Sequence, residues 1–390
     1  MRQALHRAPV IAAIAVSLTW LWMALTVHFN YKDNWTALFC IGELTPSPPQ
    51  LDKSERLYKF RNSSGYDGQF YHDLAHDPML THGSAPYIDA PRFRQRRILL
   101  PALAWVFAFG QQQWIDRSYF ATLLAFLAAG VYWLSRYSQA LGRNPWWGLL
   151  YLAVPSTIIS IDRMTTDLAF VSLFMGFVYF IRRDSLRTLW IIAAAACLTR
   201  ETGLCIVAGY TAHLLWRRQF RTAAIFATSA VPFFAWYAFI TLRTPGGDQS
   251  IYPYHYPGRA IFEAILHPNI YPVSPTLQTI LTAFDLTSLF AFLAILVLAC
   301  AMLRRDPALG SIAISFVTLA LFSSSLNGTN PVFTEVYSYG RVFSPVLLAI
   351  AIDALTRKSA LSFSLFAIVS LRSMLMIGVQ ALGILRAVLR

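Results

Sequence analysis

Charged residues are scarce in this sequence, and their scarcity excludes an ordinary soluble domain. They make up 13% of the 390 residues, whereas hydrophobic residues make up 56%, which leaves too few polar side chains to cover a water-exposed surface. Cysteine is rare as well: four are present, at no spacing typical of a metal site or a disulfide framework. Acidic residues number 19 against 32 basic ones. The basic excess lies in short clusters between apolar runs, which argues against a nucleic-acid partner.

Long apolar runs are what the sequence has instead. Many of them are about 15–24 residues long, and a helix of ~20 apolar residues crosses a bilayer. Because backbone polar groups in lipid must be paired within each segment, the runs predict an all-α polytopic membrane protein of about 10–11 transmembrane helices. The first run, from Pro9 to Phe29, is longer than the apolar core of a signal peptide, so we expect a retained helix.

Basic clusters alternate with these runs and predict the topology. Lys and Arg gather in short cytoplasmic loops, which places the N-terminus in the cytoplasm and three loops outside: 30–95, 243–278 and 326–341. The predicted spans are 9–29, 118–137, 146–161, 168–181, 222–242, 280–303, 309–325 and 342–356, with a membrane-dipping hairpin of 188–198 and 203–216. The segment 98–110 is short and is expected to be interfacial or re-entrant. The tail after residue 358 either spans once or folds back.

The first external loop holds the stretch YDGQFYHD, residues 66–73. Asp67 lies between Gly65 and Gly68, where the backbone can approach a ligand closely. A carboxylate in such a place can accept the proton of a hydroxyl that attacks a sugar carbon. Helical spacing puts Tyr71 on the same face as Asp67. The alternative is that Asp67 caps a short surface helix.

Arginines follow this acidic stretch, and one more stands at the tip of the hairpin. The densest basic run consists of Arg92, Arg94, Arg96 and Arg97. Guanidinium groups bind phosphate through paired hydrogen bonds and stabilise it as a leaving group. The alternative is that these long side chains only extend from the membrane interface into water. Arg200 stands at the tip of the predicted hairpin, where a charged side chain without a function would be costly. Its alternative role is an ion pair with Glu201.

The predicted external side collects further ionisable residues. Such residues at the edge of a membrane are costly and mark functional sites by default. They are Asp73, Asp77, Asp89, Asp162, Arg163, Asp167 and Arg341.

In their order and sidedness these motifs resemble the GT-C superfamily of integral-membrane glycosyltransferases. More narrowly, the chain is similar to the bacterial GPI-mannosyltransferase-like branch linked to cell-surface glycans. The resemblance is carried by YDGQFY at 66–71, PRFRQRRILLP at 91–101, Pro155 followed by Asp162 and Asp167, and LTRE at 198–201. It covers roughly the first 220 residues, and beyond them only Arg341 ahead of Pro345 matches.

The resemblance implies a polyprenyl-phosphate sugar donor, a glycan or glycolipid acceptor and inversion at the anomeric carbon. In some members a divalent metal, Mg or Mn, is bound, and here Asp67 and Asp167 would hold it. It also implies a catalytic module in residues 1–220 and additional transmembrane helices in 221–390. The distance from the first helix to Asp67 is longer than usual, which leaves Asp73 and Asp89 as alternative bases.

We therefore expect a glycosyltransferase of the bacterial inner membrane with a periplasmic active site. Asp67 and Asp167 are the predicted catalytic residues. The predicted substrate-binding residues are Tyr71, Asp73, Arg92, Arg94, Arg97, Arg163, Arg200, Glu201 and Arg341. The alternative from another class is a lipid-glycan flippase, which would line a path near the bilayer midplane with its polar residues.

Overall fold

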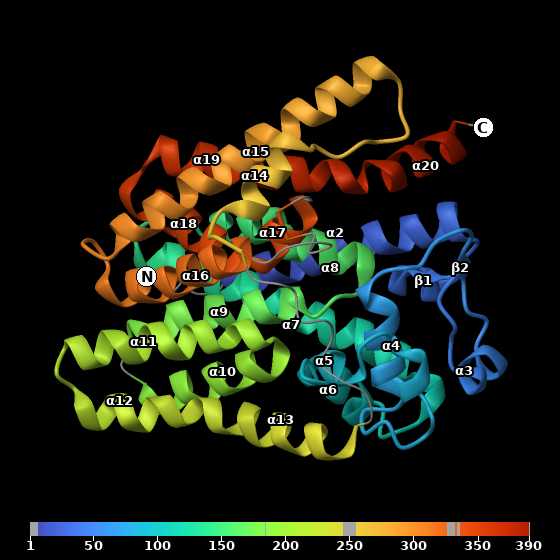
Figure 1. Cartoon of the computed structure of the whole chain (residues 1–390), viewed down its shortest axis with the longest axis horizontal. Coiled ribbons are helices and arrows are strands. Elements are labelled where there is room, and N and C mark those ends of the chain that lie inside the picture. Colours follow the sequence, from blue (N-terminus) through green and yellow to red (C-terminus); the bar gives the residue numbers. More distant parts are fainter. Residues whose placement is uncertain (1–6, 184, 245–254, 326–331, 334–335, 390) are drawn as a thin grey trace.

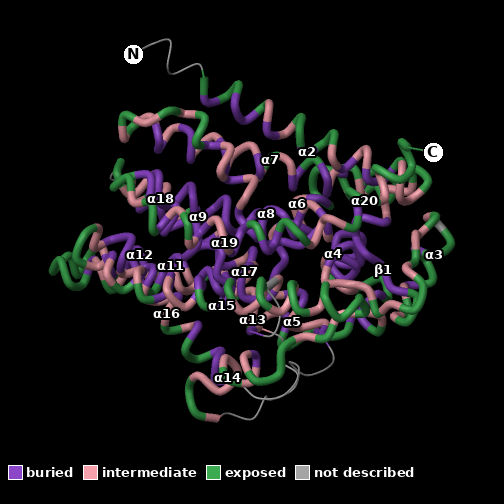
Figure 2. The backbone as a smooth tube through the Cα atoms, turned by 90° about the horizontal axis from the view of Figure 1, so that it is seen from above, coloured by how far each residue is buried: buried purple, intermediate pink, exposed green. Residues whose placement is uncertain are grey.

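Helices make up nearly all of the structure, a computed structural model that describes residues 7–183, 185–244, 255–325, 332–333 and 336–389. Many of the longer helices run along the long axis of the molecule (Figure 1). Parts of two predicted external loops, 245–254 and 326–331 with 334–335, lie outside the described residues. Buried backbone positions gather through the middle of the molecule (Figure 2).

Within the described residues, six helical segments are long and apolar enough to cross a membrane, by length and composition. They are α2 (Arg7–Tyr31), α7 (Gln112–Ala140), α12 with α13 (Phe220–Ala227 and Val231–Arg243), α15 (Pro275–Met302), α16 (Pro307–Ser324), and α19 with α20 (Ala360–Met374 and Gly378–Val388). This confirms an all-helical protein and indicates a multi-pass membrane protein. Six such segments are fewer than the 10–11 spans predicted.

The predicted spans 168–181 and 342–356 and the two arms of the predicted hairpin are shorter helices. They are α9 (Asp167–Ile181), α10 (Leu186–Thr199), α11 (Leu204–Trp216) and α18 (Ser344–Arg357), of 13 to 15 residues each. A helix of 14 residues is about 21 Å long, shorter than a ~30 Å hydrocarbon core. Among them α9 is almost entirely buried, because it packs against α7, α10, α18 and α8 (Pro155–Arg163).

The prediction of one helix over 146–161 is wrong. A 3-10 helix, η3 (Pro145–Ala153), ends at Val154, and α8 begins at Pro155. Proline has no N–H to donate and disfavours the helical conformation in the residue before it. Val154 is accordingly extended, with φ −67° and ψ 128°. The break separates η3 from α8, which ends at Arg163, and α9 then begins at Asp167.

The tail, left open from the sequence, continues as one apolar segment through α19 and α20. Arg372 of α19 is buried, and its Nε donates to Asp285 Oδ1 of α15 at 2.7 Å. Tyr271 bridges the pair, since its hydroxyl donates to Asp285 Oδ2 at 2.7 Å and accepts from Arg372 Nη2 at 3.1 Å. The arginine is therefore neutralised where α15 and α19 pack together.

The long first loop folds into short elements that position the candidate site. They are η1 (Trp35–Phe39), β1 (Ile41–Gly42), α3 (Pro49–Ser54), β2 (Lys59–Phe60), α4 (Asp67–His76), η2 (Ala85–Tyr87), α5 (Pro91–Gln95) and α6 (Leu99–Phe107). The two strands pair in parallel, with Ile41 opposite Lys59. At nine residues α6 is about 13 Å long, too short to cross a membrane by itself, and the interfacial or re-entrant position of 98–110 stays a prediction.

Candidate functional site

Asp67 opens α4 and is held by two guanidinium groups. Tyr66 is extended and is the N-cap residue, so Asp67 falls in the first helical turn, where a negative charge is favoured. Arg94 Nη1 lies 2.8 Å from Asp67 Oδ1, and Arg341 Nη1 lies 2.8 Å from Oδ2. The alternative of Asp67 as the cap of a surface helix is wrong, because the cap is Tyr66 and the rest of α4 is buried.

Gly68 makes room for a neighbouring helix, whereas the prediction was that it lets the backbone approach a ligand. A Cβ there would collide with the backbone carbonyl of Arg163, so the close approach that glycine permits is to α8 of the same chain. This contact brings the start of α4 next to the junction between α8 and α9.

Asp167, the first residue of α9, is the second carboxylate of the site. It forms an ion pair with Arg200, and Arg341 Nε lies 3.6 Å from its Oδ2. Arg341 of α17 (Val336–Val342) therefore lies between Asp67 and Asp167. The expected alternative partner of Arg200 was Glu201, but Asp167 is the carboxylate in contact.

Glu201 instead pairs with Arg97 from the linker between α5 and α6. Arg97 Nε donates to Glu201 Oε2 at 2.9 Å and Nη2 donates to Oε1 at 2.5 Å. A third donor, Nη1, reaches the hydroxyl of Tyr71 at 2.9 Å. Through these three hydrogen bonds Arg97 holds α4 to the hairpin tip between α10 and α11.

These contacts join residues from distant parts of the chain, which we call the arginine–carboxylate network. Its members are Asp67, Tyr71, Arg94, Arg97, Asp167, Arg200, Glu201 and Arg341. Every one of them was singled out from the sequence. The network draws on both predicted modules, since Arg341 comes from residues 221–390.

Three predicted site residues lie outside this network. Arg92 donates to the backbone carbonyl of Thr244 at 2.8 Å. Arg163 pairs with Asp162 at 2.9 Å and donates to Cys40 Sγ at 2.7 Å. Asp73 contacts His72 on another face of α4. The alternative base Asp89 forms a two-pronged pair with Arg94 at 2.7 and 2.9 Å.

Electrostatics keep Asp67 and Glu201 ionised. Burial by itself raises the pKa of Asp67, but Arg341, Arg94 and Arg97 outweigh it and hold that pKa well below its usual range. Burial also raises the pKa of Glu201, but the charge and hydrogen bonds of Arg97 outweigh it and lower that pKa. Arg200 Nε has no hydrogen-bond partner among the described residues although it is buried. A buried donor of this kind is suited to an anionic ligand.

Asp67 and Asp167 do not fit a divalent metal in this arrangement. Both carboxylates face guanidinium groups, and Arg341 lies between them. Magnesium and manganese favour sites of carboxylate, carbonyl and water oxygens, whereas here a metal would lie among three positive charges.

An apolar groove of about 440 Å³ adjoins the network. Ile98, which directly follows Arg97, and Leu198, two residues before Arg200, line it, and α13 contributes Trp236 and Phe239. The charged network thus borders an apolar surface, an arrangement that suits an amphiphilic ligand.

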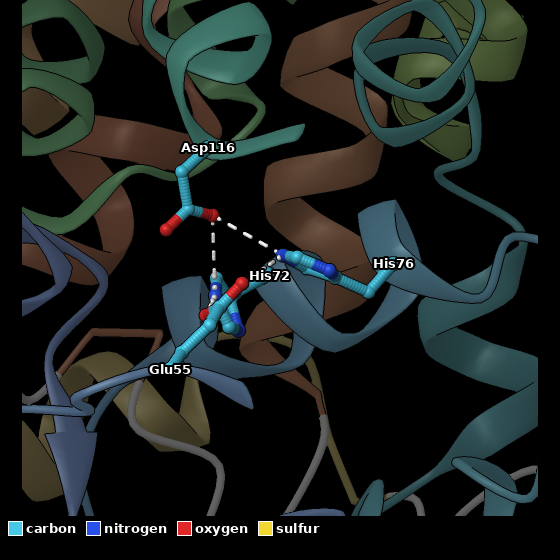
Figure 3. Close-up of side chains that lie close together, drawn as sticks. All are labelled: Glu55, His72, His76 and Asp116. Atoms are coloured by element: carbon cyan, nitrogen blue, oxygen red, sulfur yellow. Dashed lines mark hydrogen bonds and ion pairs between the residues drawn. The ribbon is translucent and has the colours of Figure 1, made fainter. Parts of the chain in front are cut away.

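A second cluster, which the sequence analysis missed, occupies another face of α4. Glu55, His72, His76 and Asp116 point their side chains toward one another (Figure 3). His72 and His76 stand four residues apart on a helix, and this spacing was the available signal. Glu55 precedes His72 by 17 residues and Asp116 follows His76 by 40, separations at which a sequence pattern does not indicate contact.

Comparisons of the chain with models of protein families, with curated proteins and with solved structures find no match.

Proposed function

We propose that this protein is a membrane glycosyltransferase that moves a sugar from a polyprenyl-phosphate donor to a glycan or glycolipid. The observation that carries the proposal is the arginine–carboxylate network, in which Asp67, Asp167 and Glu201 meet Arg94, Arg97, Arg200 and Arg341. Carboxylates for proton transfer beside guanidiniums for phosphate are what an inverting transfer from a phosphate leaving group requires.

The network also supports a one-sided active site. Its members come from the first loop, the α8–α9 junction, the hairpin tip and α17, all of which the basic clusters assign to the external side. The full proposal is a GT-C-like bundle of about 10–11 spans with a cytoplasmic N-terminus in the bacterial inner membrane. In it, loop 30–95 and the active site face the periplasm.

In the proposed reaction Asp67 accepts the proton of the acceptor hydroxyl as its oxygen attacks the anomeric carbon. The bond between that carbon and the phosphate oxygen breaks, the glycosidic bond forms with inversion, and the electron pair leaves with the phosphate. Arg97 and Arg200 bind this phosphate and stabilise the charge that develops on it. Asp167 positions the acceptor.

Donor binding would activate the base. Arg341 and Arg200 pair with carboxylates here, and a donor phosphate competes for the same guanidinium donors. When Arg341 turns to the phosphate, Asp67 loses part of the interaction that lowers its pKa and becomes a better proton acceptor. The adjacent apolar groove would receive the first isoprene units of the lipid.

The flippase alternative has less support. A transporter gathers its polar residues near the bilayer midplane along a path open to each side in turn. The network residues instead lie at helix starts and in connections: Asp67 begins α4, Asp167 begins α9, and Arg200 lies between α10 and η4 (Glu201–Gly203). This placement supports a site at one end of the bundle.

The test is a surface-glycan profile of a deletion strain complemented with wild type, Asp67→Asn or Asp52→Asn. Asp52 of α3 is an exposed carboxylate paired with Lys59, so its variant controls for the substitution itself. We expect wild type and Asp52→Asn to restore a missing sugar and an equally expressed Asp67→Asn to restore none. Restoration by Asp67→Asn would falsify the assignment of Asp67 as the base.

A further inference from the structure

We propose that Glu55, His72, His76 and Asp116 form a structural zinc site that locks α4 to α7 and to the end of α3. The proposal goes beyond the proposed function and does not depend on it, because the cluster shares none of its four residues with the arginine–carboxylate network. Imidazole nitrogen and carboxylate oxygen are both common zinc ligands, and four protein ligands are typical of structural rather than catalytic sites.

Four imidazole–carboxylate contacts are close in length to the edge of a small tetrahedron, and with one ligand atom from each residue the ligand atoms all lie within 4.8 Å of one another. His72 Nε2 lies 3.2 Å from both Glu55 Oε2 and Asp116 Oδ1. His76 Nε2 lies 3.3 Å from both Glu55 Oε1 and Asp116 Oδ1. Four ligands at zinc bond lengths of 2.0–2.1 Å around one ion are separated by about 3.3 Å. The imidazole–carboxylate contacts are thus close to the spacing around a single central ion, and the whole ligand set is compact enough to close on one.

The outer nitrogen of each imidazole also has a partner. His76 Nδ1 lies 2.6 Å from Gln112 Oε1, and His72 Nδ1 lies 3.5 Å from Asp73 Oδ1. An acceptor at Nδ1 keeps the proton there and directs the lone pair of Nε2 inward, the arrangement that accompanies most metal-bound histidines. This explains the contact of Asp73, which lies outside the network.

The chemistry of the ligand set favours zinc over other divalent ions. Imidazole nitrogen suits zinc and other late transition metals, whereas magnesium and calcium prefer oxygen alone. An entry path is present as well, because Glu55 and Asp116 line a pocket of about 780 Å³. His72 is fully buried and His76 nearly so, and the pocket is lined by the two carboxylates and not by the imidazoles.

The position of the site on α4 indicates its role. His72 and His76 follow Asp67 and Tyr71 by five residues each, which turns roughly 140° around the helix. One face of α4 therefore carries network residues and another carries the zinc ligands. Glu55 directly follows α3, and Asp116 lies near the start of α7. An ion here would fix the rotation of α4 and with it the direction of Asp67.

The first experiment measures zinc in the purified, detergent-solubilised full-length protein by elemental mass spectrometry. We expect about one zinc per chain in wild type and in His82→Gln, a control at an exposed histidine of the same loop. His76→Gln and Asp116→Asn should retain about a tenth or less, and Gln112→Leu should weaken zinc binding about 10- to 100-fold.

A second measurement uses wild-type protein, so that it tests the site even if the variants fail to fold. Wild-type protein is stripped with a chelator and titrated with Zn²⁺ alone while the melting temperature and the bound zinc are followed. Saturation at one equivalent with a raised melting temperature supports the site. No zinc in purified wild type together with no uptake after stripping would overturn it, as would unchanged binding in folded His76→Gln and Asp116→Asn. In those cases the cluster is a set of ion pairs.

Discussion

At the scale of single residues, Asp67 shows how surroundings decide what a carboxylate does. Its acidity is set by Arg341 and Arg94, each 2.8 Å away. Since these guanidiniums hold its pKa below the ordinary value, the charged form is more stable in the folded protein than in the unfolded chain. The stabilisation is complete above the unfolded pKa of about 3.9 and is lost as the pH falls toward the folded value.

This gives a prediction for the pH dependence of stability. The difference in melting temperature between wild type and Asp67→Asn should be constant from about pH 8 to pH 5 and should shrink below about pH 4. Thermal unfolding in detergent across this range measures it. Asp52→Asn, at an exposed carboxylate, should differ little from wild type throughout. A difference that grows below pH 4 would contradict the ion pairing described here.

At the scale of elements, the site depends on how closely α4 packs against α8. Gly68 makes this contact, since any Cβ would overlap the Arg163 carbonyl. The residues around the site could be predicted from the sequence because their types and order carry information. The packing role of Gly68 could not, since it depends on how α4 meets α8. The break before Pro155 is a local effect of the proline, which the prediction of one helix over 146–161 overlooked.

The corresponding prediction concerns Gly68→Ala. The added methyl group should push α4 away from α8, destabilise the protein by about 1–3 kcal/mol and reduce transfer, because backbone cannot yield as a flexible side chain does. Gly378→Ala is the matched control, since a Cβ there meets nothing within 4 Å. The melting temperatures of both variants, compared with that of wild type, measure the destabilisation. Equal, small effects would show that the contact at Gly68 is unimportant.

At the scale of the whole molecule, the C-terminal segment is tied to the bundle by an ion pair between two candidate spans. Arg372 of α19 and Asp285 of α15 are 2.7 Å apart. Removing one member of a buried pair leaves the other charge uncompensated, whereas replacing both by apolar residues of similar size is often neutral.

A double-mutant cycle tests the contribution of this ion pair to stability. Arg372→Leu and Asp285→Leu should each lower stability by about 3–5 kcal/mol, and the double variant should recover most of that loss. The readout is the melting temperature in detergent together with the amount of folded protein in the membrane fraction. Losses that add in the double variant would show that the two charges are independent.

Composition and hydropathy alone determined that the protein is helical and built of segments able to cross a membrane. Those properties follow from each segment's own residues, because a backbone in lipid must pair internally. The members of the arginine–carboxylate network were also evident from residue type and predicted side.

Tertiary structure alone decided which of them touch: Arg200 meets Asp167 rather than Glu201, and Arg97 pairs with Glu201. It also brought Glu55 and Asp116 to the two histidines of α4. Contacts of this kind arise where separate elements pack together, and local sequence patterns carry no information about such distances.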